Sequence, residues 1–304
     1  MDTKVSHADA ELKRLGMLSC TGDDAREFLH AQLTNDFSAL AADRARYAGW
    51  CSAKGRLLAN FLVVPQAQGF LLQLSRDLAP AVAKRLSMFV LRAKVKVTDA
   101  SNEWTQFGLW GTGAAERLAA LGMPVPTGDL VVAPDADAVV VRITQQHFVL
   151  LVKAAQRDRV PGNSDEGAWA LEEIRAGRPL VVQATQDLFV PQMVNLERLG
   201  AVDFKKGCYP GQEIVARTQY RGVLKRRMVR ARVAAAAAAP GNDLYADDLP
   251  GQASGTVVNA APAPEGGSEL LAVVQISSLE NAAAIRFGAA DGPQLELLPL
   301  PFAA

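Results

Sequence analysis

The sequence contains few aromatic residues and no excess of charge of either sign. Aromatic residues make up 6% of the 304 residues, so we expect a core built mainly of Ala, Leu and Val. Lysine plus arginine and aspartate plus glutamate number 32 each, so no global charge indicates a nucleic-acid or membrane partner. The sequence also lacks an apolar run of about 18 residues and an apolar signal segment near its start.

Cysteine is also scarce. Cys20, Cys51 and Cys208 are far apart, and none forms a Cys-x-x-Cys pair. Their odd number and wide spacing argue against a disulfide framework, and no zinc signature is present. A reducing, cytoplasmic location is the simplest interpretation, with no resident metal.

The pattern of apolar residues and turns predicts an α+β fold over residues 1–225. Helices are predicted after residue 24 and over residues 78–91, 112–121 and 166–176. Strands are predicted over residues 44–52, 56–65, 70–74, 94–98, 104–110, 138–143 and 148–153. Short loops and antiparallel pairs favour α+β layers over a doubly wound parallel sheet.

The character changes at about residue 226. Short β-like runs at 229–233, 255–259, 270–276, 283–287 and 295–298 are separated by turns rich in Gly, Pro, Asn and Asp. Residues 226–304 are therefore predicted to form a small β-barrel or sandwich. The alanine run 234–239 is interpreted as a loop insert without chemistry.

The segment 204–217 carries the strongest chemical pattern. Lys205 and Lys206 precede Cys208, and a helix starting at Pro210 would place this cysteine just before a helix N-terminus. Such a setting favours the thiolate, lowering a cysteine pKa from about 8.5 into a range of about 3.5–7.5. Cys208 would then be a nucleophile or soft metal ligand; a cysteine simply packed at a turn is the alternative.

The same region is basic. Residues 205–232 contain nine lysines and arginines and one acid, Glu213. The cluster is either a solvated face or a surface for an anionic ligand or an RNA backbone. We favour an anion, since the cations surround the cysteine.

The eight residues from Lys206 to Glu213, KGCYPGQE, resemble the signature of the YgfZ family. Further segments similar to this family follow the same order: 32–36, 53–56, 189–192, 195–196 and 255–257. The resemblance implies a folate-binding portion of two ferredoxin-like α+β subdomains, followed by a C-terminal β-barrel. It also implies a role in making or repairing iron–sulfur clusters for enzymes such as the tRNA methylthiolation system. Lys206 and Cys208 are the residues expected to act.

The YgfZ family is related to the T-protein of glycine cleavage, an aminomethyltransferase. Its catalytic aspartate pair corresponds here to Ala59 and Asn60, neither of which is a carboxylate. Gln212 stands in place of a basic residue, and Arg175 in place of a pterin-binding glutamate. An aminomethyl or one-carbon transferase is therefore the second hypothesis, and an RNA-binding module the third.

The resemblance implies a site for tetrahydrofolate or a one-carbon derivative. The residues predicted to bind it are Asn35, Lys54, Asn60, Gln192, Tyr209, Gln212, Glu213 and Arg217. Amides suit the pterin edge, a ring can stack, and cations suit the glutamate tail. Asn35 as a helix cap and Lys54 as a turn residue are the alternatives. The other expected partners are iron–sulfur enzymes or assembly proteins, with a weak contact to tRNA. No membrane partner is expected.

Overall fold

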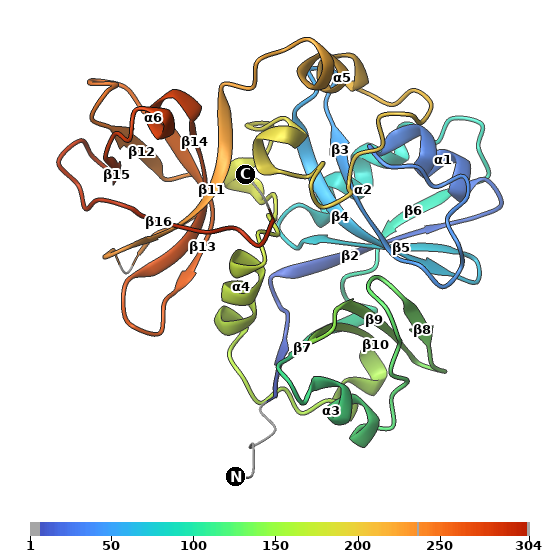
Figure 1. The fold of residues 1–304 in the computed structure, drawn as a ribbon. Helices are drawn as coiled ribbons and strands as arrows, with labels where there is room; N and C mark the ends of the chain where they lie inside the picture. The colour runs from blue at the N-terminus through green and yellow to red at the C-terminus, as the bar shows by residue number, and fades with distance from the viewer. Residues whose placement is uncertain (1–6, 236, 303–304) are drawn as a thin grey trace. The chain divides into compact units, whose positions relative to one another are not determined.

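Three antiparallel sheets and six α-helices organise the computed structural model, which describes residues 7–235 and 237–302 (Figure 1). The helices are α1 (Ala25–Gln32), α2 (Ala79–Ser87), α3 (Ala114–Ala120), α4 (Glu166–Arg175), α5 (Gln212–Tyr220) and α6 (Ile276–Glu280). The first ten strands are β1 (Ala8–Glu11), β2 (Leu15–Thr21), β3 (Arg46–Cys51), β4 (Leu57–Gln66), β5 (Gly69–Ser75), β6 (Lys96–Asp99), β7 (Trp104–Trp110), β8 (Val132–Pro134), β9 (Ala138–Thr144) and β10 (His147–Lys153). The remaining strands are β11 (Arg226–Val233), β12 (Asp243–Ala246), β13 (Gly255–Pro262), β14 (Ser268–Gln275), β15 (Ile285–Phe287) and β16 (Glu296–Leu298). Short 3-10 segments are η1 (Ala154–Arg159), η2 (Gln183–Thr185) and η3 (Pro191–Val194).

The chain divides into two compact units. Unit 1 comprises Met1–Ala31, Asp36–Ala48 and Phe61–Trp169, and unit 2 comprises Gln32–Asn35, Gly49–Asn60 and Ala170–Ala304. Unit 2 therefore combines two short early segments with the whole C-terminal part of the chain. The predicted division at 225/226 groups the residues differently and stays a prediction.

Unit 1 contains strands whose side chains point alternately to the two faces of a sheet, and each face of its first sheet buries an apolar cluster. Its first sheet has the order β1-β7-β10-β9-β8, and strands β2, β5 and β6 belong to a second sheet of order β3-β4-β5-β2-β6. Met17 and Leu71 of the second sheet pack in one cluster with Val141 and Leu151 of the first. Helix α3 covers the other face of the first sheet, where Leu118 packs with the strand residues of a second cluster.

Gly108 in β7 shows how close this packing is. A Cβ atom at this position would lie 2.3 Å from the ring of Trp169, so only glycine admits the indole against the strand. The ring also contacts Trp110 edge-on, with 5.7 Å between ring centroids.

Unit 2 contains the C-terminal sheet, whose order is β15-β12-β13-β14-β11-β16. The central strand β14 is buried along almost its whole length, as expected for a strand at the centre of a curled sheet. A bridge joins Arg286 of β15 to Gln294, and β16 just beyond it pairs with β11. The run 293–298 thus bridges to the edge strand β15 and pairs with β11 at the other side of the sheet, where its own β16 forms the edge.

The coarse prediction of a mixed fold with antiparallel sheets is confirmed, whereas the ferredoxin-like description stays a prediction. The helix predicted over 78–91 is too long: α2 ends at Ser87, and Leu91 lies in the left-handed region with φ 45°. The strand predicted over 270–276 ends at Gln275, where α6 begins. Strands β1, β2, β8 and β12 were not predicted.

No helix among residues 7–235 and 237–302 combines the length and apolar character needed to cross a bilayer. The polar start at residues 1–6, and Ala236 within the alanine run, lie outside the described residues.

Candidate functional site

All residues predicted to act or to bind a ligand lie in unit 2. They come from its two early segments and from residues 192–217, so the unit gathers positions that are far apart in sequence.

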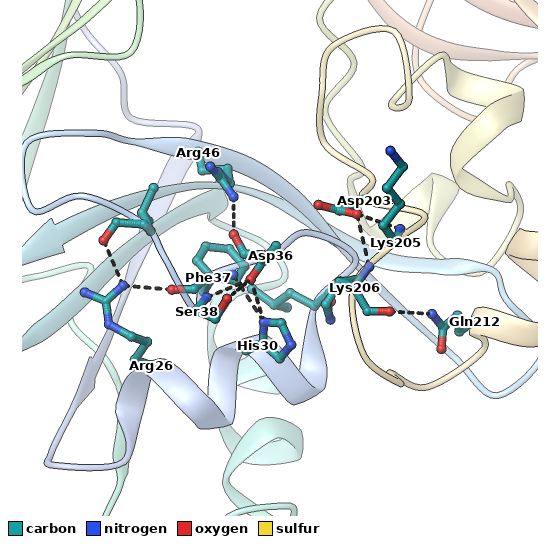
Figure 2. Close-up of polar contacts among 12 residues, drawn as sticks. Arg26, His30, Asp36, Phe37, Ser38, Arg46, Asp203, Lys205, Lys206 and Gln212 are labelled. Carbon is teal, nitrogen blue, oxygen red and sulfur yellow. Dashed lines mark hydrogen bonds and ion pairs between the residues drawn. The ribbon is translucent and has the colours of Figure 1, made fainter.

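The signature loop is held by its own polar groups (Figure 2). The Asp203 Oδ1 atom accepts the backbone N–H groups of Lys205 and Lys206, at 2.7 and 3.1 Å. The Gln212 side chain donates to the carbonyl of Lys206 at 3.4 Å. An Asp that accepts hydrogen bonds from residues two and three positions later stabilises a turn, which here sets the direction of the lysine.

Lys206 points into the unit. Its residue is only 9% exposed, its Nζ donates to the carbonyl of Leu33 at 2.8 Å, and the same atom lies 4.7 Å from the centroid of the Tyr209 ring. A buried ammonium is costly unless hydrogen bonds or a ring face compensate it, and both are present here. The lysine therefore links the end of α1 to the signature loop.

The three cysteines differ sharply in environment. Cys208 is exposed, whereas Cys20 and Cys51 are buried. Burial raises the pKa of the Cys20 thiol to about 12. Burial, with a smaller contribution from the charge of Asp187, raises the pKa of the Cys51 thiol to about 12. Neither buried cysteine is a thiolate at neutral pH, which leaves Cys208 as the accessible thiol among the three cysteines.

Tyr209 is buried near Cys51 rather than exposed for stacking. Burial raises the pKa of its phenol above the usual range, and the nearby Cys51 and Asp203 add to the effect. Tyr209 therefore stays neutral, with one ring face directed to the Lys206 ammonium.

Two glycines bring the turn at residues 53–55 against the start of α5. Gly211 has φ 79°, and a Cβ atom there would lie 2.3 Å from the Ser52 carbonyl oxygen and 2.7 Å from the Gly55 Cα. Lys54, at this turn, is exposed. Helix α5 begins at Gln212, not at Pro210 as predicted, because the left-handed Gly211 precedes the helix as its N-cap.

The predicted amide side chains differ in whether their oxygen atoms have a hydrogen-bond donor. Asn35 is buried and donates to the Gly200 carbonyl at 2.6 Å. Gln192 is 2% exposed and donates to the Val215 carbonyl at 2.8 Å, while its Oε1 has no hydrogen-bond donor among the described residues. The same is true of the buried Oδ1 of Asn195. Buried acceptors without a donor are unusual in a folded protein and suit a ligand that supplies N–H groups.

Asn60 uses both of its polar groups on the backbone. Its Nδ2 donates to the Pro179 carbonyl, and its Oδ1 accepts the Val181 N–H, both at 2.8 Å. Asn259 forms the same pair with the N–H and carbonyl of Leu180, at 2.8 and 2.9 Å. The two asparagines together fix the segment 179–181, so the structure provides a structural role for Asn60.

Arg175 is held in an ion-pair network with the C-terminal sheet. Its guanidinium donates to Glu269 at 2.8 and 3.2 Å and to Glu172 at 3.4 Å. The hydrogen bonds with Glu269 are the main cause of a raised Arg175 pKa. Sequence reasoning treated Arg175 only as a replaced pterin residue; Glu269, its partner in β14, lies 94 positions later and carried no local signal.

The remaining predicted residues lie on the outer side of α5. Glu213 and Arg217 are both exposed. Among the described residues no group of three or more His, Cys, Asp or Glu side chains is placed to hold a metal ion.

A second polar group in Figure 2 lies within unit 1 and contains none of the predicted site residues. Hydrogen bonds from the Ser38 hydroxyl and N–H are the largest causes of a lowered Asp36 pKa, and His30 lies 2.9 Å from the same carboxylate. Arg26 donates to the carbonyls of Phe37 and Leu40. These contacts shape the turn over residues 36–40.

The fold of the chain resembles that of a known aminomethyltransferase. The chain superposes on aminomethyltransferase T of the glycine cleavage system from Bartonella henselae with a TM-score of 0.79 and 18% identity, covering 99% of this chain and 87% of that one. Residues 2–129 match the family described as the GCVT N-terminal domain. The architecture is thus that of the T-protein.

Closer relatives identify the family. The tRNA-modifying protein YgfZ of Edwardsiella ictaluri (strain 93-146) is 32% identical over 298 residues, covering 94% of this chain and 89% of the relative. The protein of that name from Vibrio vulnificus (strain YJ016) is 32% identical over 225 residues, covering 72% and 68%. The chain belongs to the YgfZ family.

Proposed function

We propose that this protein binds a reduced folate, tetrahydrofolate or a one-carbon derivative, and assists the assembly or repair of iron–sulfur clusters. Its partners would be iron–sulfur enzymes, such as those of tRNA methylthiolation, or cluster assembly proteins. Membership of the YgfZ family and the T-protein architecture support the proposal.

The observation that carries the cluster role is the contrast between Lys206 and Cys208. The lysine is fixed inside unit 2 by the Leu33 carbonyl, while the cysteine two residues later is exposed on a loop closed by Asp203. A rigid loop that presents one accessible sulfur suits transient capture of iron or sulfur as cargo. A lone cysteine does not form a stable metal site, so the cargo would pass on to a partner.

The folate role is supported by two of the four buried side-chain acceptors that have no donor among the described residues. Gln192 Oε1 and Asn195 Oδ1 suit the amino and ring N–H donors of a pterin. The exposed Lys54 and Arg217 provide cations suited to a glutamate tail. When bound, the folate would carry a one-carbon unit; the residues of this chain would hold and orient it.

The aminomethyltransferase alternative receives less support from this site. Ala59 carries no functional group, and both polar groups of the Asn60 amide are engaged by the backbone at 179–181. Release of ammonia from an aminomethyl donor by the purified protein, in the presence of tetrahydrofolate, would favour that alternative.

Titration calorimetry with tetrahydrofolate tests the proposal. The wild type and Cys208→Ala are expected to bind equally, at micromolar level or about −8 kcal/mol. A Gln192→Leu variant removes one acceptor and is expected to bind more weakly. Absence of binding by the wild type would exclude the folate role.

The cluster role needs a separate measurement. In a strain lacking this gene, Cys208→Ala is expected not to restore the activity of iron–sulfur enzymes, although its folate affinity is unchanged. Cys20→Ala, which alters a buried cysteine in unit 1, is the matched control and is expected to restore activity. Full restoration by Cys208→Ala would overturn the cluster role.

A further inference from the structure

The basic segment 205–232 divides into two parts in the structure. Its strand β11 contributes arginines that pair with acids of the same unit. Arg227 pairs with Glu197, and Arg230 donates to Glu269 at 2.6 and 3.0 Å. These cations hold β11 in place and are not available as a binding surface.

The cations before β11 are different. Four of them are exposed, and none forms an ion pair with another residue in the described ranges 7–235 and 237–302: Lys205, Arg217, Arg221 and Lys225. Lys54 is also exposed, on the turn that contacts Gly211 at the start of α5. The acids near these five cations are Glu213, Asp203 beside Lys205, and Asp187 beside the turn of Lys54, so this part of the surface keeps an excess of positive charge.

An aromatic ring lies among these cations. Tyr220 is 67% exposed and is held edge-on by Phe204, with 6.0 Å between ring centroids and 72° between ring planes. Arg217 and Tyr220 are three positions apart, so they share one face at the end of α5, and Arg221 follows directly as the C-cap of the helix.

We propose that this face of unit 2, formed by the end of α5 and the connection to β11 (Figure 1), binds a single-stranded nucleic acid. The Tyr220 ring stacks on a base, and Lys205, Arg221 and Lys225 contact the phosphates on either side. Sites that bind single-stranded nucleic acids without sequence preference combine an aromatic ring for base stacking with surrounding cations for the phosphates, as this face does. An acidic peptide would satisfy the cations but offers no flat ring for Tyr220.

This inference goes beyond the proposed function, because it requires neither folate nor Cys208. It also gives a reason for the local concentration of positive charge in a chain whose total charge is balanced. Long-range attraction to phosphate needs only a local excess of positive charge.

Fluorescence anisotropy tests the proposal with labelled oligouridine and oligothymidine of about 12 nucleotides, within the range bound by single-strand proteins. Binding is expected to weaken with salt, with a slope of log affinity against log salt of about −0.7 for each phosphate contacted. Preference for one oligonucleotide would assign RNA or DNA as the source. An oligoglutamate peptide of equal charge is expected to compete poorly.

Three variants and one control variant sharpen the test. Tyr220→Ala is expected to weaken binding about tenfold with the salt slope unchanged, and Tyr220→Phe to retain affinity. The double variant Arg221→Ala/Lys225→Ala is expected to reduce the slope by about 1.4. Lys84→Ala/Arg92→Ala, which removes two exposed cations of unit 1, is the matched control and should change neither value.

Two results would overturn the proposal. One is wild-type affinity of Tyr220→Ala together with equal competition by oligoglutamate, which would indicate an acidic protein partner. The other is equal loss of binding in the unit 1 control, which would indicate nonspecific attraction. Circular dichroism confirms that the variants remain folded, and unchanged folate binding would separate this failure from failure of the proposed function.

Discussion

At the scale of single residues, Lys206 is a positive charge buried within unit 2. A backbone carbonyl and the face of a neutral tyrosine surround its ammonium. The lysine thus ties the signature loop to the Leu33 backbone within unit 2.

Lys206→Met is expected to destabilise the protein. The variant leaves the Leu33 carbonyl without its donor, and an unsatisfied buried polar group costs about 1–3 kcal/mol. Thermal denaturation measures the loss. Lys205→Met, at an exposed position, is the control and should stay within about 0.5 kcal/mol of the wild type. Equal melting temperatures for the two variants would mean that Lys206 has no structural role.

Gly211→Ala is expected to lower the free energy of unfolding by more than the strain of its left-handed backbone conformation alone. A left-handed alanine costs about 1–2 kcal/mol, and here the added Cβ also meets the Ser52 carbonyl. Gly200 is the matched control, since its φ of 66° is similar but nothing lies within 4 Å of a Cβ there. Chemical denaturation of both variants should therefore show a larger loss for Gly211→Ala. A loss of equal size would remove the steric argument.

At the scale of elements, the segment 179–181 joins β4 to β13. Asn60 of β4 and Asn259 of β13 each make two backbone hydrogen bonds to this segment. Neither asparagine is near its partner in sequence. The pairing explains how the strand carrying the altered T-protein position is tied to the C-terminal sheet.

Asn60→Ala and Asn259→Ala together separate a structural from a ligand role. Each is expected to lower the free energy of unfolding by about 1–3 kcal/mol, because buried backbone groups lose their partners. If Asn60 also contacts folate, calorimetry will show weaker tetrahydrofolate binding for Asn60→Ala alone. Equal folate affinity of both variants would restrict Asn60 to the structural role.

Much of the element pattern was predictable from the sequence. The turn at residues 53–55, the helix before Gly177 and the short strands after residue 226 follow from local periodicity and from Gly and Pro. Helix α5 was harder to bound, because Val215 is its one buried residue and Gly211 adopts a left-handed conformation that a sequence does not reveal.

The candidate site was predictable in its chemistry but not in its geometry. Motif spacing indicated Lys206 and Cys208, whose roles stay predictions. The inward direction of Lys206 depends on a carbonyl 173 positions earlier, and the partner of Arg175 lies 94 positions later. Contacts of this range arise from tertiary packing, so no local pattern contains them.

At the scale of the whole molecule, stability should depend on the ionisation of Glu269. Burial raises the pKa of this carboxyl, but hydrogen bonds from Arg175 and Arg230 outweigh burial and lower it below its usual range. A carboxyl whose pKa is lower in the folded protein than in the unfolded chain stabilises the fold. This contribution is fully present at pH values above the unfolded-state pKa of about 4.3, and it is lost as the pH falls through the folded-state pKa.

Urea denaturation between about pH 7 and pH 3 checks this dependence. The wild type is expected to lose stability progressively below about pH 4.5. Glu269→Gln should be less stable at neutral pH by up to about 3 kcal/mol, since two arginines lose their charged partner, and its acid dependence should be flatter. Parallel pH curves for the two proteins would contradict the assignment.

The hydrogen bond from Lys206 to Leu33 also has a consequence for biosynthesis. Its partners are separated by 173 residues, which a ribosome adds in about 9–35 s at 5–20 residues per second. Throughout that interval the early segments of unit 2 have left the ribosome without the later residues that complete them. The signature loop is therefore assembled late, and a nascent chain released too early exposes an unfinished half of the molecule to chaperones and proteases.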